Sequence, residues 1–203
     1  MFLLAELRDT VKVHPRFFGE KIQKSIVTTL NKKYANKIVH NVGLCIALWD
    51  VTKMKDSYIF PGDGSSHTIV EFRFVVFRPF VDEILTGKIK NSSSEGVNVT
   101  LGFFDDIFIP ADSLPIPNRF IEASQLWAWE YEMEDGKKHD LIIEHGEEIR
   151  FKVIDEMFVD KTPSTLANPT TIQQPTDANV APYSIVASIS DPGLGLLSWW
   201  AGT

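Results

Sequence analysis

The stretch GEEIRFKVID, residues 146–155, sets the pattern of the C-terminal half of the chain. In it, Ile149, Phe151 and Val153 alternate with charged side chains. Strict alternation predicts a strand with one apolar face turned to an interior and one polar face turned to water. Gly146 stands at the start, where a tight corner suits a residue without a side chain.

Short strands with turn signals between them surround this stretch. We expect them at residues 84–90, 97–101, 107–110, 126–131, 141–143 and 148–154, with a closing strand at 183–190. Spacing this regular, with glycine at the corners, predicts a small closed barrel. Residues 161–182 hold four prolines, many Thr, Asn and Gln, and few hydrophobic residues. That composition predicts a flexible loop inserted before the closing strand.

The N-terminal half follows a different pattern. A first strand is expected at residues 2–13, and further strands at 42–51, 57–60 and 68–77. Between the first two of these strands an apolar side chain recurs every four residues, which predicts a helix of about five turns that begins near Pro15. These side chains are Phe18, Ile22, Ile26, Leu30 and Tyr34. The expected order is β-helix-β-β-β, an α+β domain over residues 1–79, followed by an all-β domain over residues 80–203.

Charge divides the chain in the same way. The net charge of −7 combines +5 over residues 1–79 with −12 over residues 80–203. Because phosphate contacts dominate nucleic-acid affinity, the acidic half argues against tight independent RNA binding. The basic half suits docking on an acidic protein surface. The longest apolar runs are too short to span a bilayer and no secretory signal is recognisable, so we expect no membrane association.

The sequence shows no clear catalytic or metal-binding pattern. None of the five histidines is paired with Cys or another His at metal-ligand spacing, so no metal and no cofactor are expected. Ser65, Ser66 and His67 follow Asp63, but no G-x-S-x-G elbow surrounds them, and a turn is the better interpretation. The single cysteine, Cys45, lies in an apolar run and is expected in the core.

Several motifs resemble those of known proteins. Gly87-Lys88-Ile89, GVNV at 96–99 and the stretch at 146–155 resemble, in order, an S1-type OB-fold. A longer set resembles the family formed by the larger stalk component of archaeal and eukaryotic RNA polymerases. It consists of NVGLC at 41–45, PGDG at 61–64, FRPF at 77–80, EIL at 83–85, LGFFDDI at 101–107 and WAWEY at 127–131. DPGLGLLSWW at 191–200 resembles the polymerase III member more than the polymerase II member.

The resemblance implies a non-catalytic, nuclear subunit of DNA-directed RNA polymerase III that supports initiation and guides nascent RNA. The first domain, a tip domain related to truncated RNP folds, would dock on the polymerase core. Its tip loop matches Pro61, Gly62, Asp63, Gly64 and His67. A small helical subunit would complete a heterodimeric stalk, and the OB-fold would lie near the RNA exit path. Initiation factors are further implied partners.

Two sets of residues are candidates for contacts in the second domain. For RNA they are the cations Lys88, Lys90, Arg150 and Lys152 and the aromatic residues Phe103 and Phe104. The alternatives are an ordinary polar strand face for the cations and barrel packing for the two Phe. For a protein partner they are the apolar tail residues Leu194, Leu196, Leu197, Trp199 and Trp200. Such a tail either packs on its own barrel or anchors a partner.

Two other functions compete with this one. The chain could be the equivalent stalk subunit of RNA polymerase II, or a free-standing S1-type RNA-binding factor of translation or RNA decay. The acidic second half argues against the free-standing factor.

Overall fold

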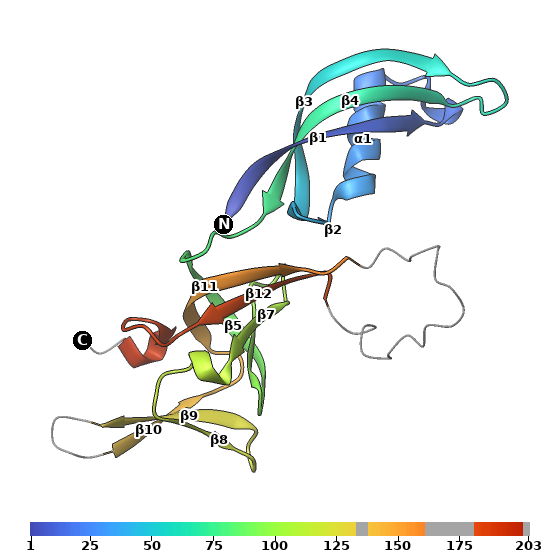
Figure 1. The fold of residues 1–203 in the computed structure, drawn as a ribbon. Coiled ribbons are helices and arrows are strands. Elements are labelled where there is room, and N and C mark those ends of the chain that lie inside the picture. The colour runs from blue at the N-terminus through green and yellow to red at the C-terminus, as the bar shows by residue number, and fades with distance from the viewer. Residues whose placement is uncertain (133–137, 161–180, 201–203) are drawn as a thin grey trace, which may run out of the picture. The chain divides into compact units, whose positions relative to one another are not determined.

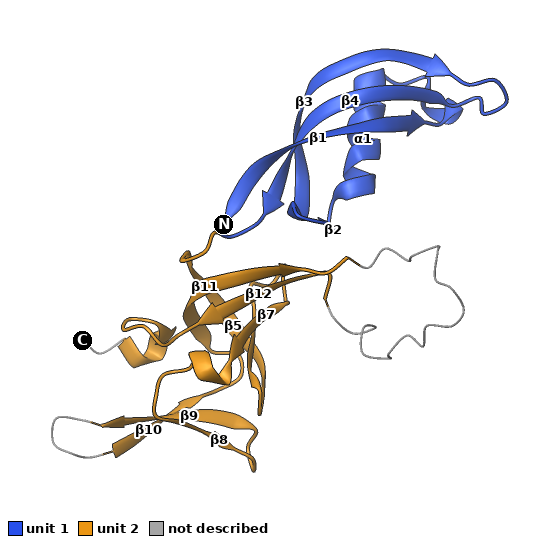
Figure 2. Ribbon diagram, viewed as in Figure 1, with its two compact units in different colours: residues 1–79 blue, residues 80–203 orange. Residues whose placement is uncertain are grey.

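The computed structural model describes residues 1–132, 138–160 and 181–200 (Figure 1). The chain forms two compact units, Met1–Pro79 and Phe80–Thr203 (Figure 2). The loop expected at residues 161–182 lies outside the described residues, apart from its last two positions.

The first unit is one antiparallel sheet with one α-helix. Its elements are β1 (Phe2–Val13), the 3-10 turn η1 (Pro15–Phe17), α1 (Ile22–Tyr34), β2 (Lys37–Val39), β3 (Gly43–Ile59) and β4 (Ser66–Phe77). The strand order is β1-β4-β3-β2. Along β4, buried and part-exposed residues alternate, so Val70, Phe72 and Phe74 face the core while Glu71 and Arg73 face away. The predicted β-helix-β-β-β order is confirmed.

The individual strands of that order differ from the prediction. The strands expected at 42–51 and 57–60 are one long strand, β3, and the short β2 supplies the missing one. β3 shifts its register against β4 at four places between Cys45 and Ser57. Each bulge interrupts the alternation of apolar and polar residues, so a continuous strand resembles two in the sequence.

The helix also begins later than its apolar stripe suggested. Pro15–Phe17 form a separate 3-10 turn, and α1 covers 13 residues from Ile22. Ile26 and Leu30 are fully buried in the core cluster. Phe18 remains 48% exposed, so the first part of the predicted stripe does not face the core.

A half-buried carboxylate ties β1 to the end of α1. Asp9 Oδ2 accepts hydrogen bonds from Lys33 Nζ at 2.5 Å and from Tyr34 OH at 2.9 Å. Burial alone raises the pKa of Asp9, but the bonds from Lys33 and Tyr34 outweigh it and the pKa is lowered. Burial and the neighbouring Asp9 raise the pKa of Tyr34 to about 12.

The second unit contains a closed five-stranded barrel. Its strands are β5 (Ile84–Ser93), β6 (Gly96–Thr100), β7 (Ile107–Pro110), β11 (Glu148–Phe158) and β12 (Tyr183–Ser188). The order is β12-β7-β6-β5-β11, and pairing of β12 with β11 closes the barrel. The two-residue strand β13 (Gly195–Leu196) pairs with β11. Ile149, Phe151 and Val153 are buried, as their alternation predicted, and the OB-fold is confirmed.

Two strands predicted for the barrel lie elsewhere. β9 (Leu126–Glu132) and β10 (Lys138–Ile143) form a separate three-stranded sheet with β8 (Asn118–Ile121), which the sequence pattern missed. The indole of Trp127 is 6% exposed and donates a hydrogen bond from Nε1 to the carbonyl oxygen of Ser93 at 2.9 Å. This bond connects the small sheet to the end of β5. Regular spacing of short strands did not distinguish a barrel strand from a strand of this added sheet.

Candidate docking and RNA-binding surfaces

The predicted tip loop connects β3 to β4. Gly62 and Gly64 have φ angles of +89° and +67°, in the left-handed region that favours glycine. Asp63 lies between them, and its carboxylate accepts hydrogen bonds from Lys12 Nζ and His67 Nε2, both at 2.7 Å. Lys12, and next His67, hold the pKa of Asp63 down to about 2. Sequence reasoning missed Lys12, because it lies in β1, 51 residues away.

Aromatic side chains precede this loop. Between ring centroids, His67 lies 5.0 Å from Phe60 and 6.1 Å from Tyr58. The centroids of Tyr58 and Phe60 are 5.0 Å apart. Phe60 is 51% exposed and Tyr58 is 41% exposed. Exposed aromatic rings beside a loop are frequent anchors of protein interfaces.

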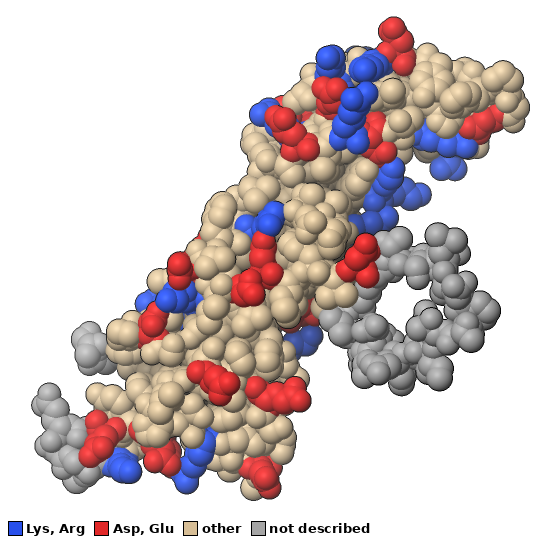
Figure 3. All heavy atoms as spheres, in the orientation of Figure 1, with Lys and Arg blue, Asp and Glu red and all other residues tan. Residues whose placement is uncertain are grey.

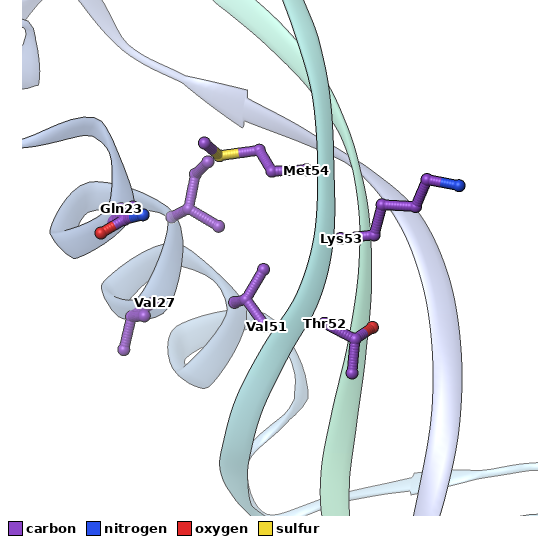
Figure 4. A pocket seen from close by; sticks show the side chains of 7 residues that line it. Gln23, Val27, Val51, Thr52, Lys53 and Met54 are labelled. Carbon is purple, nitrogen blue, oxygen red and sulfur yellow. The ribbon is translucent and has the colours of Figure 1, made fainter.

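Two hollows lie on the first unit. One, of about 260 Å³, is lined by Val13, Phe17, Phe18, Glu20, Ile22, Ser25, Ile59 and Ser66. The other, of about 370 Å³, lies between α1 and β3 and is lined by Gln23, Ile26, Val27, Val51, Thr52, Lys53 and Met54. Figure 4 shows Val51 and Met54 projecting from β3 towards α1, with Lys53 on the opposite side of the strand. The walls of the smaller hollow are mainly apolar and suit packing against a protein, whereas the larger one also has the polar Gln23, Thr52 and Lys53 in its lining.

The four candidate cations lie on neighbouring barrel strands, but carboxylates accompany three of them. Lys90 Nζ is 2.9 Å from Asp105 Oδ2, and Lys88 Nζ is 4.0 Å from Glu148 Oε1. Lys152 pairs with Asp191 and lies 3.7 Å from Asp82. The fourth, Arg150, is exposed on β11, opposite Thr86 of β5. An RNA phosphate has to compete with these carboxylates for the lysines.

The two candidate phenylalanines lie in different environments. Phe104 is 4% exposed, and its ring is 5.4 Å from that of Tyr183 in the barrel. Phe103 is 44% exposed and is the one of the pair that can reach a base. Phe108, which no sequence motif singled out, lies on the outer face of β7 opposite Asn98. The alternation of buried and half-exposed residues in IFIP, residues 107–110, was the signal for it.

The C-terminal tail packs on its own unit. Leu194 and Leu196 are 5% and 1% exposed, and β13 pairs with Ile149 and Arg150 of β11. Trp199 packs on Trp129 at 5.2 Å between ring centroids. Leu197 and Trp199 are half-buried, whereas Trp200 is 40% exposed. Of the five tail residues that are candidates for a partner contact, Trp200 therefore offers the most surface, and Leu194 and Leu196 offer almost none.

Within residues 1–132, 138–160 and 181–200, no three His, Cys, Asp or Glu side chains are grouped so as to hold a metal ion. In those ranges no helix has the length and apolar character needed to cross a membrane. Ser65 and Ser66 are 2% and 7% exposed, while His67 is bonded to Asp63. Ser65 lies just before β4, and Ser66 and His67 are the first two residues of that strand.

Charge is unevenly spread over the two units. In Figure 3, blue and red atoms are interspersed over residues 1–79, whereas red atoms predominate over residues 80–203. The acidic character predicted for the second half is thus a property of its visible surface.

Comparisons with known proteins agree with this fold. The family "RNA polymerase III subunit Rpc25" matches residues 83–200, and the "SHS2 domain found in N terminus of Rpb7p/Rpc25p/MJ0397" matches residues 8–64. DNA-directed RNA polymerase III subunit RPC8 of Bos taurus is 56% identical over 205 residues, which cover 100% of both chains. The subunit rpc8 of Schizosaccharomyces pombe is 43% identical over 203 residues, 98% of this chain and 100% of the relative.

A polymerase II relative matches a smaller part of the chain. Subunit RPB7 of Saccharomyces cerevisiae RNA polymerase II is 31% identical over 104 residues, 50% of this chain and 61% of the relative. The polymerase III relatives match the chain over nearly its whole length, and the Rpc25 family covers the barrel, the added sheet and the tail. The chain therefore belongs to the family of RNA polymerase III subunit Rpc25, whose relatives are named RPC8.

Proposed function

We propose that this chain is the larger stalk subunit of RNA polymerase III and that it acts in the nucleus as a non-catalytic part of the enzyme. The observation that carries the proposal is the 56% identity to an RNA polymerase III subunit over the full length of both chains. A polymerase II subunit is not favoured, because that match covers half of the chain. A free-standing RNA-binding factor is not favoured either, because both units match polymerase subunits.

In this proposal the first unit docks on the polymerase core through its tip loop, residues 61–67. The loop is a defined turn: two glycines in the left-handed region shape it, and Lys12 and His67 hold Asp63 from both sides. A loop already held in one shape loses little conformational entropy when it binds.

The second unit contacts nascent RNA weakly. Lys88, Lys90 and Lys152 project from the barrel, yet each lies close to a carboxylate of the same chain. Phosphate contacts supply most of the affinity for single-stranded RNA, and paired lysines supply less of it. Phe103 and Phe108 are the aromatic side chains that we place against bases. Such a surface suits guiding RNA already delivered by the enzyme.

The remaining partners follow from the family. We propose that a small helical subunit binds this chain to complete the stalk, and that transcription initiation factors contact it at promoters. Exposed Trp200 is the tail residue that we place in a partner contact.

Purification of the tagged chain from cells, with identification of the bound proteins by mass spectrometry, tests the proposal. We expect the RNA polymerase III core and one small subunit in stoichiometric amounts. Recovery of the polymerase II core would assign the chain to the other enzyme. Recovery of ribosomes or decay factors without a polymerase would overturn the proposal. Polymerase depleted of the chain should keep elongating on a preformed RNA–DNA scaffold while losing promoter-dependent initiation, because the subunit itself is non-catalytic.

A further inference from the structure

We propose that Tyr58 and Phe60 are the side chains that anchor the tip to the polymerase core, and that Asp63 is a positioning residue that holds them through His67. This inference rests on the proposed function of the tip loop and names the residues that perform it. The receiving site is an apolar slot of the polymerase III core.

The anchors lie on one face of the β3–β4 hairpin, on the side away from α1. Tyr58 pairs with His67 across the two strands, and the three rings of Tyr58, Phe60 and His67 are all within 6.1 Å of one another between centroids. Tyr58 and Phe60 nevertheless remain 41% and 51% exposed. Large aromatic rings that pack on each other and still face water lose further apolar area on binding.

The opposite face of the same hairpin end is apolar too. Ile59 is 58% exposed and lines the hollow of about 260 Å³ together with Phe18 and Ile22, which are 48% and 39% exposed. A hairpin with apolar side chains on both faces is fully covered only when a partner surrounds it. The geometry therefore fits insertion into a slot better than contact with a flat surface.

A short chain of hydrogen bonds fixes the ring of His67, and the rings of Tyr58 and Phe60 pack on that ring. Lys12 Nζ donates to Asp63 Oδ1, and His67 Nε2 is 2.7 Å from Asp63 Oδ2. The side chain of His67 is 15% exposed and contacts Asp63 and the rings of Tyr58 and Phe60. These contacts determine its position. Asp63 thereby connects β1, the tip loop and β4 at one point. Without it, the rings and the loop would have to be ordered during docking, which weakens binding.

The test measures binding of the full chain, in complex with its stalk partner, to RNA polymerase III from which the stalk has been removed. We expect Phe60→Ala and Tyr58→Ala to weaken binding by about tenfold or more each, as truncation of an anchor does. Asp63→Asn should weaken binding by about threefold to tenfold and speed amide hydrogen exchange over residues 60–67. Thermal melting should show that each variant is folded.

Matched controls separate this effect from general surface changes. Trp49→Ala removes an aromatic side chain that is 63% exposed on β3, far along the strand from the loop, and should leave binding unchanged. Asp140→Asn removes a carboxylate that accepts a hydrogen bond from Arg119 in the other unit and should also leave binding unchanged. Because Asp63 acts through the rings, Asp63→Asn should have little further effect in the Phe60→Ala background. Fully additive losses would contradict the positioning role.

Deletion of residues 61–64 distinguishes the two levels of the proposal. If the deletion abolishes binding while Tyr58→Ala and Phe60→Ala bind as the unmodified chain does, the tip loop docks on the core but Tyr58 and Phe60 are not its anchors. If the deletion also binds normally, the docking function of the tip loop fails together with the inference.

Discussion

Trp199 lies directly against the backbone of Gly195. A Cβ atom at Gly195 would be 2.5 Å from Cζ3 of the indole ring, closer than any carbon–carbon contact allows. Gly195 also has a φ angle of +100°, where other residues are strained. The glycine thus lets the 3-10 turn η4 (Leu197–Trp200) fold back over β13.

We therefore expect Gly195→Ala to destabilise the second unit by about 1–3 kcal/mol, from backbone strain and displacement of the ring. Denaturant unfolding followed by tryptophan fluorescence measures this. Gly193→Ala is the control, because Gly193 has a φ of +85° with no atom within 4 Å of the added Cβ. Equal losses in both variants would mean that the contact with Trp199 contributes nothing.

Packing and partner binding by the tail can be separated with two substitutions. Leu196→Ala empties a site that is 1% exposed and should cost about 2–4 kcal/mol of unfolding free energy. Trp200→Ala alters a side chain that is 40% exposed and should change stability by less than about 1 kcal/mol while reducing recovery of the stalk partner. Normal recovery with Trp200→Ala would exclude this residue from the interface.

Asp9 should contribute stability that depends on pH. Its pKa in the folded chain is lowered, so its contribution is present above the unfolded value of 3.8 and is lost as the pH falls through the folded value. We expect Asp9→Asn to lower the unfolding free energy by about 1–2 kcal/mol at pH 7 and by progressively less below about pH 4. Urea unfolding followed by circular dichroism at several pH values checks this. Asp56→Asn, at an exposed position on β3, should show no comparable loss.

Cys45 should be unreactive in the folded chain. It is fully buried in the core cluster, and burial raises the pKa of its thiol to about 11. At pH 8 a thiol reagent should therefore modify the native chain at least about a hundredfold more slowly than the chain unfolded in guanidinium chloride. In the native chain little of the thiol is ionised, and the reagent cannot easily reach it. Equal rates would show that the first unit opens readily around β3.

Asp105 should limit RNA binding by the barrel. It accepts hydrogen bonds from Lys90 and from Thr100, at 2.9 and 2.5 Å. Asp105→Asn frees the lysine for phosphate and removes a repelling charge. We expect about twofold to fivefold tighter binding of single-stranded RNA at low salt and a steeper salt dependence. Adding Lys90→Ala should reverse the gain. If it does not, or if Lys88→Ala with Lys90→Ala leaves binding by the unmodified chain unchanged, these lysines do not meet RNA.

Local periodicity in the sequence determined much of the fold. In β4 and in residues 148–154, apolar and polar side chains alternate because one face of the strand is buried and the other faces water. The pattern involves only successive residues, so the sequence shows it without a structure. Short or irregular strands were not visible. β2, β8 and β13 are two to four residues long, too short to show a periodic pattern. β2 and β8 pair with the strand that follows each of them, and β13 pairs with the distant β11. The bulges of β3 make one strand resemble two.

The sequence motifs also determined the family, since they recur in order along nearly the whole chain. Which side chains of the candidate sites are available was decided only by the tertiary structure. Phe103 and Phe104 are neighbours, yet one is 44% exposed and the other fills the barrel. Lys12 reaches Asp63 across 51 residues, and Asp191 reaches Lys152 across 39. These contacts join segments far apart in the chain, so local sequence carries little information about them.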